Sequence, residues 1–303
     1  MGGSGGGGYS GSSDISKDRR EALELLRRQE TEAAINGYLG EQLANINNRD
    51  IPGTRRRLDA IVDALGTEAV DVDRLLFGGS VSKHTYVDGL SDVDALVVVD
   101  EPDAAPGDLV NRFVLALKAR LPAGEVVTIA PGNLAVTVTY TDGAQIQLLP
   151  AVERAGHTSI ASEDGSTWRQ IRPHKFAEKL TEVNQANGDG VIPTIKLAKA
   201  LVQELSPEHR LSGYHVEAIA VDAFKDYSGR RDRASMLHHL VAHAADAVMV
   251  PTGDISGQSV HVDSYLGPAG SVARQAISAD FRRLAAGLES ADGPDDVRTL
   301  FGG

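Results

Sequence analysis

The sequence predicts an α+β protein with two lobes, a mixed-sheet lobe followed by an all-helical lobe. Three observations lead to this prediction. A long helix-period pattern opens the chain after a Gly-rich start, short apolar runs separated by turn residues fill the middle, and helix-period segments occupy most of the chain after Pro150. Since clefts between lobes are common binding sites, we expect the functional site between the two lobes.

The N-terminal part of the chain reads as a tail and two helices. Residues 1–13 are rich in glycine and serine, and we expect a flexible tail there. Helical periodicity covers residues 14–46 and 54–65. The dipeptide formed by Pro52 and Gly53 predicts a turn between these two helices.

The middle of the chain changes to strand periodicity, and Asp142 with Gly143 gives a hairpin signal between two of its strands. We assign residues 14–160, which include the two helices, to the sheet lobe and residues 161–303 to the helical lobe. The long first helix is expected to be able to pack on both. Strands are predicted at residues 74–77, 92–99, 126–130, 134–140 and 145–149, and further helices at 107–121, 173–184, 191–205, 213–227, 233–249 and 271–289.

The composition narrows the class of protein. Of the 303 residues, 42% are hydrophobic and 24% are charged, a balance typical of globular proteins. The absence of cysteine excludes disulfide frameworks, thiolate nucleophiles and zinc–thiolate sites. The sequence shows no apolar run long enough for a membrane span and no signal-like apolar segment at its start, so we expect a cytoplasmic protein without a membrane partner.

The chain is acidic, with 30 basic and 42 acidic residues and a formal net charge of −12. A broad basic face for duplex DNA or RNA is therefore not expected. A local anion site needs only two or three cations directed inward. The charge balance is therefore compatible with a local anion site.

The segment with the most chemical information runs from Phe77 to Asp94. A strand end is followed by two glycines and Ser80, then by a predicted helical turn, then by Asp92 and Asp94. Glycine lets a backbone approach a ligand closely, and the start of a helical turn offers N–H groups to an anion. Asp92 and Asp94 lie two apart in a strand, so both carboxylates project to one face. A phosphate cradle beside paired carboxylates is suited to two Mg²⁺ ions and a nucleotide.

The order of these features resembles the nucleotidyltransferase fold of the DNA polymerase β type. In detail it resembles the bacterial cGAS/DncV-like nucleotidyltransferases (CD-NTases), the oligonucleotide cyclases of CBASS anti-phage defence. The resemblance covers nearly the whole chain, and further blocks that carry it are residues 147–151, 193–199, 211–217 and 252–267.

This resemblance implies an enzyme that condenses nucleoside triphosphates such as ATP and GTP into a cyclic di- or trinucleotide and releases pyrophosphate. It implies Mg²⁺ as cofactor, replaceable by Mn²⁺, and catalytic, metal-binding roles for Asp92 and Asp94. Lys196 lies three residues before Lys199, on the same helix face. Contacts with the nucleotide are expected for Gly79 and Ser80 (triphosphate), Lys199 and Lys196 (triphosphate), Ser212 (phosphate) and Tyr214 (stacking on a base).

Gln147 departs from the family pattern, which usually has a third metal-binding aspartate at this position. An amide oxygen can bind Mg²⁺ but brings no charge. Three explanations stay open. A branch of the family uses glutamine natively, which we favour because the surrounding blocks are intact; a neighbouring carboxylate such as Asp142 compensates; or the chain is a nucleotide-binding pseudoenzyme.

Two further expectations concern targets and partners. A nucleotidyltransferase that modifies RNA, a protein or a small molecule is the alternative activity. The chain ends in Gly302 and Gly303, and a flexible C-terminal glycine resembles the tails that are conjugated in some family members. This resemblance makes Gly303 a candidate conjugation site for a regulatory defence protein. The alternative is a plain frayed end. Structural or surface roles are expected for the other notable side chains: His238, His239, His243, Trp168, Asp263 and Arg55 to Arg57.

Overall fold

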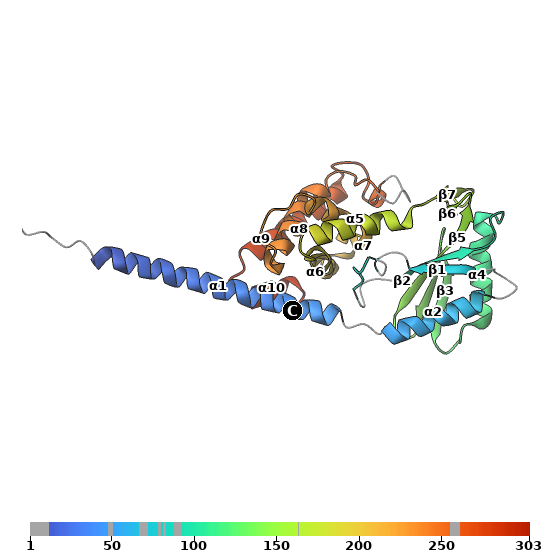
Figure 1. The fold of residues 1–303 in the computed structure, drawn as a ribbon, viewed down its shortest axis with the longest axis horizontal. Helices are drawn as coiled ribbons and strands as arrows, with labels where there is room; N and C mark the ends of the chain where they lie inside the picture. The colour runs from blue at the N-terminus through green and yellow to red at the C-terminus, as the bar shows by residue number, and fades with distance from the viewer. Residues whose placement is uncertain are drawn as a thin grey trace, which may run out of the picture.

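The computed structural model describes residues 12–47, 51–66, 72–77, 80, 83–87, 93–162, 164–254 and 261–303. A sheet-containing lobe lies beside a helical lobe, and a long N-terminal helix runs along the helical lobe and extends past it (Figure 1). The predicted α+β architecture of two lobes is confirmed. No helix in the described part of the chain is long and apolar enough to cross a membrane.

The first helix, α1 (Ser12–Ile46), packs on the helical lobe. Its second half places Ile35, Tyr38 and Leu39 in the apolar core of that lobe, whereas the side chains described between residues 17 and 30 are exposed. The sequence-based division assigns this helix to the sheet lobe and allows it to contact both lobes, whereas its buried side chains lie in the core of the helical lobe. Of the predicted Gly-rich tail, residues 1–11 lie outside the described residues, and residues 12 and 13 belong to α1.

The second helix, α2 (Ile51–Leu65), packs on the sheet through Leu58 and Ile61. The predicted turn at Pro52 and Gly53 is wrong, because both residues lie in the first turn of this helix. Proline is tolerated there since its missing N–H would have no intrahelical partner.

One mixed sheet forms the core of the first lobe. The strands β1, β2, β5, β4 and β3 follow one another in that spatial order, and β6 pairs with β5 and β7. The pair β2 and β5 is parallel, and the other described pairs are antiparallel. The sheet continues to Gln170, past the boundary we set at 160. The strands are β1 (Val72–Phe77), β2 (Val93–Val99), β3 (Val126–Pro131), β4 (Val136–Tyr140), β5 (Gln145–Arg154), β6 (His157–Ala161) and β7 (Trp168–Gln170).

The two faces of the sheet differ because side chains alternate along each strand. On one face, Ala95 and Val97 of β2 pack in an apolar core with α2 and α4 (Pro106–Arg120). On the other face, Leu96 and Val98 pack with residues of β5 and β6. Asp94 has the same alternation as Leu96, so it lies on this second face.

Helices make up nearly all of the second lobe and share one apolar core. Behind this core, the fully buried Arg274 forms an ion pair with Asp263 at 2.8 Å and donates hydrogen bonds to the carbonyl of Val248. Asp263 also accepts a hydrogen bond from the backbone N–H of Thr252, which supports the structural role we expected for it. The helices are α5 (Pro173–Ala186), α6 (Val191–Gln203), α7 (Gly213–Ala223), α8 (Arg233–Ala247), α9 (Val272–Glu289) and α10 (Pro294–Leu300), with short 3-10 helices at Pro207–His209 and Ser264–Leu266.

The C-terminus is folded against α1. The ring of Phe301 lies edge-on to Tyr38 with the centroids 6.3 Å apart, and the N–H of Gly303 donates to the carbonyl of Arg298. The last turn thus contacts α1 through Phe301, whereas Gly302 and Gly303 are exposed, and the role expected for the C-terminal glycine stays a prediction.

Candidate functional site

Asp94 and Gln147 are neighbours in the sheet. They are register partners on the parallel strands β2 and β5, and Thr137 of β4 is the next residue in the same row. Residues in one row project to the same face, with adjacent strands about 4.8 Å apart. One carboxylate, one amide and one hydroxyl therefore gather on the face of the sheet opposite α2 and α4.

These oxygen donors belong to the chemical class that Mg²⁺ prefers. Of the two carboxylates predicted to bind metal, the structure describes Asp94, whereas Asp92 lies outside the described residues, as does Gly79. Within the described residues, no three His, Cys, Asp or Glu side chains form a cluster that could hold a metal. The row fits Mg²⁺ by the nature of its donors, with Gln147 contributing a neutral oxygen.

Asp142, the carboxylate considered as compensation for Gln147, is engaged in its own hairpin. It accepts hydrogen bonds from Arg57 at 2.6 Å and from the backbone N–H of Ala144 at 3.2 Å. The hydrogen bond from Arg57 is the main cause that lowers the pKa of Asp142. Its oxygens thus stabilise the turn between β4 and β5, and Arg57 also lies over the ring of Tyr140.

Ser80 supplies a buried hydroxyl without a partner. Its side-chain oxygen is inaccessible and makes no hydrogen bond within the described part of the chain. Its backbone carbonyl accepts from the N–H of Thr85 at 2.9 Å, which holds Ser80 next to Thr85. Leaving a buried hydroxyl unsatisfied costs roughly 1–3 kcal/mol, so this geometry favours a ligand that accepts its hydrogen bond.

A buried carboxylate, Glu217 of α7, joins the two lobes next to Ser80. It accepts a hydrogen bond from Lys199 of α6 at 2.8 Å and is ion-paired with Lys83. It also accepts a hydrogen bond from the hydroxyl of Thr85, while Lys199 donates to the Thr85 carbonyl at 3.0 Å. Segment 83–87 of the sheet lobe is thereby attached to two helices of the helical lobe.

The charges of this cluster do not cancel. Two ammonium groups, Lys83 and Lys199, face one carboxylate, which leaves one positive charge in excess. Burial lowers the pKa of Lys199, and the Glu217 carboxylate opposes that effect. Burial raises the pKa of Glu217, but Lys199 and Lys83 together outweigh it and lower the pKa, so the carboxylate is ionised at neutral pH. Asp94 also acts electrostatically on Lys199, which relates the cluster to the row of oxygens in the sheet.

Tyr214 and Phe176 form an aromatic pair beside these lysines. Their ring centroids are 4.8 Å apart, and the Lys83 ammonium lies 4.6 Å from the Tyr214 centroid and 4.9 Å from the Phe176 centroid. The Tyr214 hydroxyl donates to Asp254 at 2.7 Å. The residue predicted to stack on a base thus adjoins the cation cluster.

Two predicted nucleotide contacts make other interactions in this structure. The Lys196 ammonium donates to the side chain of Asn47 at 2.6 Å, just after the end of α1. The Ser212 hydroxyl accepts from the N–H of His215 and so caps the N-terminus of α7. Their roles toward a nucleotide stay predictions.

Sequence reasoning missed Glu217, Lys83 and Thr85. Lys83 and Thr85 lie within the Gly-rich motif, and Glu217 ends one of the blocks that resemble the family. A lone glutamate in the otherwise apolar stretch of α7 was the available signal, because a buried acid requires a cationic partner.

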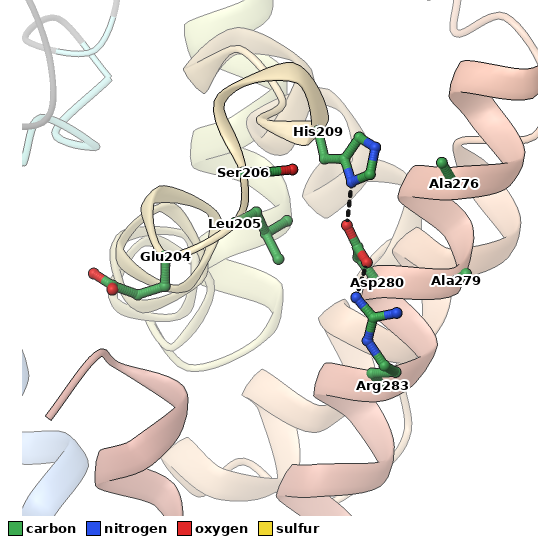
Figure 2. A pocket seen from close by; sticks show the side chains of 8 residues that line it. All are labelled: Glu204, Leu205, Ser206, His209, Ala276, Ala279, Asp280 and Arg283. Carbon is green, nitrogen blue, oxygen red and sulfur yellow. Dashed lines mark hydrogen bonds and ion pairs between the residues drawn. The ribbon is translucent and has the colours of Figure 1, made fainter.

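A separate cavity of about 400 Å³ lies between the end of α6 and α9 (Figure 2). His209 hydrogen-bonds through Nδ1 to Asp280 at 2.6 Å, and Arg283 pairs with the same carboxylate. None of the residues we predicted for nucleotide binding lines this cavity. It is lined by Glu204, Leu205, Ser206, His209, Ala276, Ala279, Asp280 and Arg283.

No protein-family model matches the sequence, and no curated protein matches it. Solved structures do match the fold. The CD-NTase CdnG of Bradyrhizobium diazoefficiens in complex with GTP aligns with a TM-score of 0.66 at 16% identity, covering 88% of this chain and 97% of that chain. CdnC of E. coli MS115-1 with ATP aligns with a TM-score of 0.62 at 15% identity, covering 86% of this chain and 91% of that chain. The cyclic AMP-GMP synthase DncV of Vibrio cholerae aligns with a TM-score of 0.60 at 13% identity, covering 95% of this chain and 90% of that chain. The predicted nucleotidyltransferase-type fold is therefore confirmed.

Proposed function

We propose that the protein is a metal-dependent nucleotidyltransferase that condenses nucleoside triphosphates into a cyclic oligonucleotide and releases pyrophosphate. The observation that carries the proposal is the pairing of two elements at one place. A buried cation cluster with an unpartnered hydroxyl suits a polyphosphate, and a row of oxygen donors on the adjoining sheet suits a metal. The shared fold supports it, since the CdnG and CdnC structures contain GTP and ATP.

The residues of the site have separate tasks in this proposal. Ser80 donates its hydroxyl to a phosphate oxygen, and Lys83 and Lys199 neutralise negative charge on the triphosphate. Tyr214 stacks on a base at the edge of the cluster. Asp92, Asp94 and Gln147 would hold Mg²⁺, which when bound stabilises charge on the phosphates and lowers the pKa of an acceptor hydroxyl.

Gln147 motivates a second candidate. The residue occupies the row position beside Asp94 but brings no charge, so a nucleotide-binding pseudoenzyme follows if metal binding is too weak for catalysis. A transferase that modifies RNA, a protein or a small molecule uses the same site chemistry with a different acceptor.

Product analysis separates these candidates. The purified protein is incubated with ATP, GTP and their mixture, with Mg²⁺ or Mn²⁺, and the products are examined by mass spectrometry. A phosphatase-resistant small product identifies a cyclase, whereas label retained on RNA or protein identifies a transferase. The Asp92→Ala/Asp94→Ala double variant should make no product while keeping the fold, and robust product from it would overturn the assignment.

The Gln147→Asp variant addresses the third metal position. We expect it to synthesise product at lower metal concentration than the wild type, because a carboxylate adds charge at the row position beside Asp94. If neither protein forms product while both bind nucleotide, the pseudoenzyme candidate is favoured.

A role in anti-phage signalling and conjugation through Gly303 complete the proposal, which places the enzyme in the cytoplasm with its nucleotide substrates. Conjugation requires that the last turn leave its contacts with Tyr38 and Arg298. Deletion of Gly302 and Gly303 tests this part. Unchanged conjugation in cells and unchanged phage defence would remove Gly303 from the proposal.

A further inference from the structure

Glu217 lies where the lysines of the two lobes meet. Its side chain is 1% exposed, and its partners come from two segments: Lys83 and Thr85 from segment 83–87, and Lys199 from α6. Each of these partners is itself buried. A carboxylate in such a place is costly to desolvate and is retained only when its partners are fixed around it.

The ammonium groups of Lys83 and Lys199 bind the same carboxylate, one on each oxygen. Two like charges do not approach closely in a buried site without an anion between them. Glu217 is the anion that the structure provides. Through Thr85, whose N–H donates to the Ser80 carbonyl, the same carboxylate is also connected to the residue that carries the unpartnered hydroxyl.

We infer that Glu217 is a positioning residue, which holds Lys83, Lys199 and, through Thr85, Ser80 together as one preformed triphosphate site. The inference rests on the proposed nucleotidyltransferase function. Glu217 itself contacts no phosphate. Its carboxylate holds both ammonium groups in place before the nucleotide arrives, so that binding does not require two buried cations to be assembled at that moment.

The experiment compares magnesium tripolyphosphate, MgATP and MgGTP as probes of the wild type and of Glu217→Gln. Affinity is measured by calorimetry, and KM and kcat are measured by pyrophosphate release. The unfolding temperature of each protein is measured without ligand. We expect the variant to lose about tenfold or more in affinity for all three probes and to raise KM more than it lowers kcat. Glu217→Asp, which restores the charge on a shorter side chain, should recover part of the affinity.

The matched control is Asp222→Asn, which removes an exposed carboxylate from the same helix, where it pairs with His243. It should leave all affinities unchanged. If Glu217→Gln folds poorly, Glu217→Asp carries the test, because it keeps the charge and both lysines but shortens the side chain that holds them. We expect weaker tripolyphosphate binding in a folded protein, and an affinity equal to that of the wild type would overturn the positioning role.

The outcomes separate the two levels of the proposal. Wild-type protein that binds none of the probes contradicts the proposed function itself. Wild-type protein that binds them, together with a Glu217→Gln variant of equal or higher affinity, leaves the function intact and overturns the positioning role. Equal or higher affinity would mean that the carboxylate only offsets positive charge and that the lysines find their places without it.

Discussion

The Lys83 ammonium lies 4.6 Å from the centroid of the Tyr214 ring, so a cation from the sheet lobe covers an aromatic side chain of the helical lobe. Phe176 flanks the same ammonium at 4.9 Å. A cation over a ring face is attracted by the π electrons. The interaction contributes roughly 0.5–2 kcal/mol, with the larger value where the cation is desolvated. In the absence of nucleotide, Lys83 therefore has two sets of partners, the rings and Glu217. In the proposed function, a triphosphate becomes a further partner of the same ammonium group.

Substitution of Tyr214 separates the contribution of its ring from that of its hydroxyl. We expect Tyr214→Ala to weaken binding of MgATP and MgGTP about tenfold, because loss of the ring removes a stacking surface for the base. Tyr214→Phe keeps the ring and loses only the hydrogen bond to Asp254, so its affinity should stay within about twofold of the wild type. Calorimetric titration checks both. Equal losses in the two variants would assign the effect to the hydroxyl and contradict stacking.

The buried ion pair of Arg274 and Asp263 gives a stability prediction that does not depend on function. Asp263→Ala leaves an uncompensated buried guanidinium and should lower the free energy of unfolding by about 3–5 kcal/mol in urea titrations. The exposed pair of Arg282 and Asp246 serves as control, and Asp246→Ala should change stability by less than about 1 kcal/mol. Similar small effects for both variants would show that the buried pair is dispensable.

His215 predicts a dependence of stability on acid. Burial, reinforced by the charge of Arg274 and opposed by Asp263, lowers the pKa of His215 to about 4. The unfolded chain then binds the proton more readily than the folded one. The stability contributed by neutral His215 is fully present above about pH 6.5 and is lost as the pH falls toward 4, by roughly 3 kcal/mol at most.

Denaturant titrations between pH 7 and pH 4 measure this loss. His215→Gln should show a shallower decline of stability in that window, whereas His157→Gln, at an exposed position of β6, should follow the wild type. Parallel curves for wild type and His215→Gln would contradict the assignment.

Periodicity predicted the long elements well because each of them buries a continuous stripe or face. The apolar run in β2 and the stripes of α6 and α8 belong to the two cores. The strands β6 and β7 were missed because they are short and mostly polar, and they exist through their pairing with β5 and with each other. Helix α10 was missed for a related reason: its seven residues bury only Val297.

The candidate site was predicted in part. The structure places Asp94 in β2 beside its register partner Gln147, whereas Asp92 lies outside the described residues, so the shared face of the two carboxylates stays a prediction. The role of Glu217 depends on contacts with Lys199, 18 residues away, and with Thr85, 132 residues away. No local pattern encodes contacts over such distances, because the first arises from the packing of α6 on α7 and the second from the docking of the two lobes.

Ser80 provides a prediction in which stability and binding change in opposite directions. Its hydroxyl is buried without a partner, so Ser80→Ala removes an unsatisfied polar group and should leave the unfolding temperature unchanged or raise it. The same variant loses a donor to phosphate, and its affinity for magnesium tripolyphosphate should fall several-fold. Calorimetry and thermal unfolding of one preparation measure both effects.

Ser278 is the matched control, since its equally buried hydroxyl donates to the Ala245 carbonyl at 2.6 Å. Ser278→Ala leaves that carbonyl unpaired and should lower the unfolding temperature without changing tripolyphosphate affinity. A Ser80→Ala variant that behaves like Ser278→Ala would show that the Ser80 hydroxyl serves the fold. The pocket would then lack its hydroxyl donor, and phosphate recognition would depend on the two lysines alone.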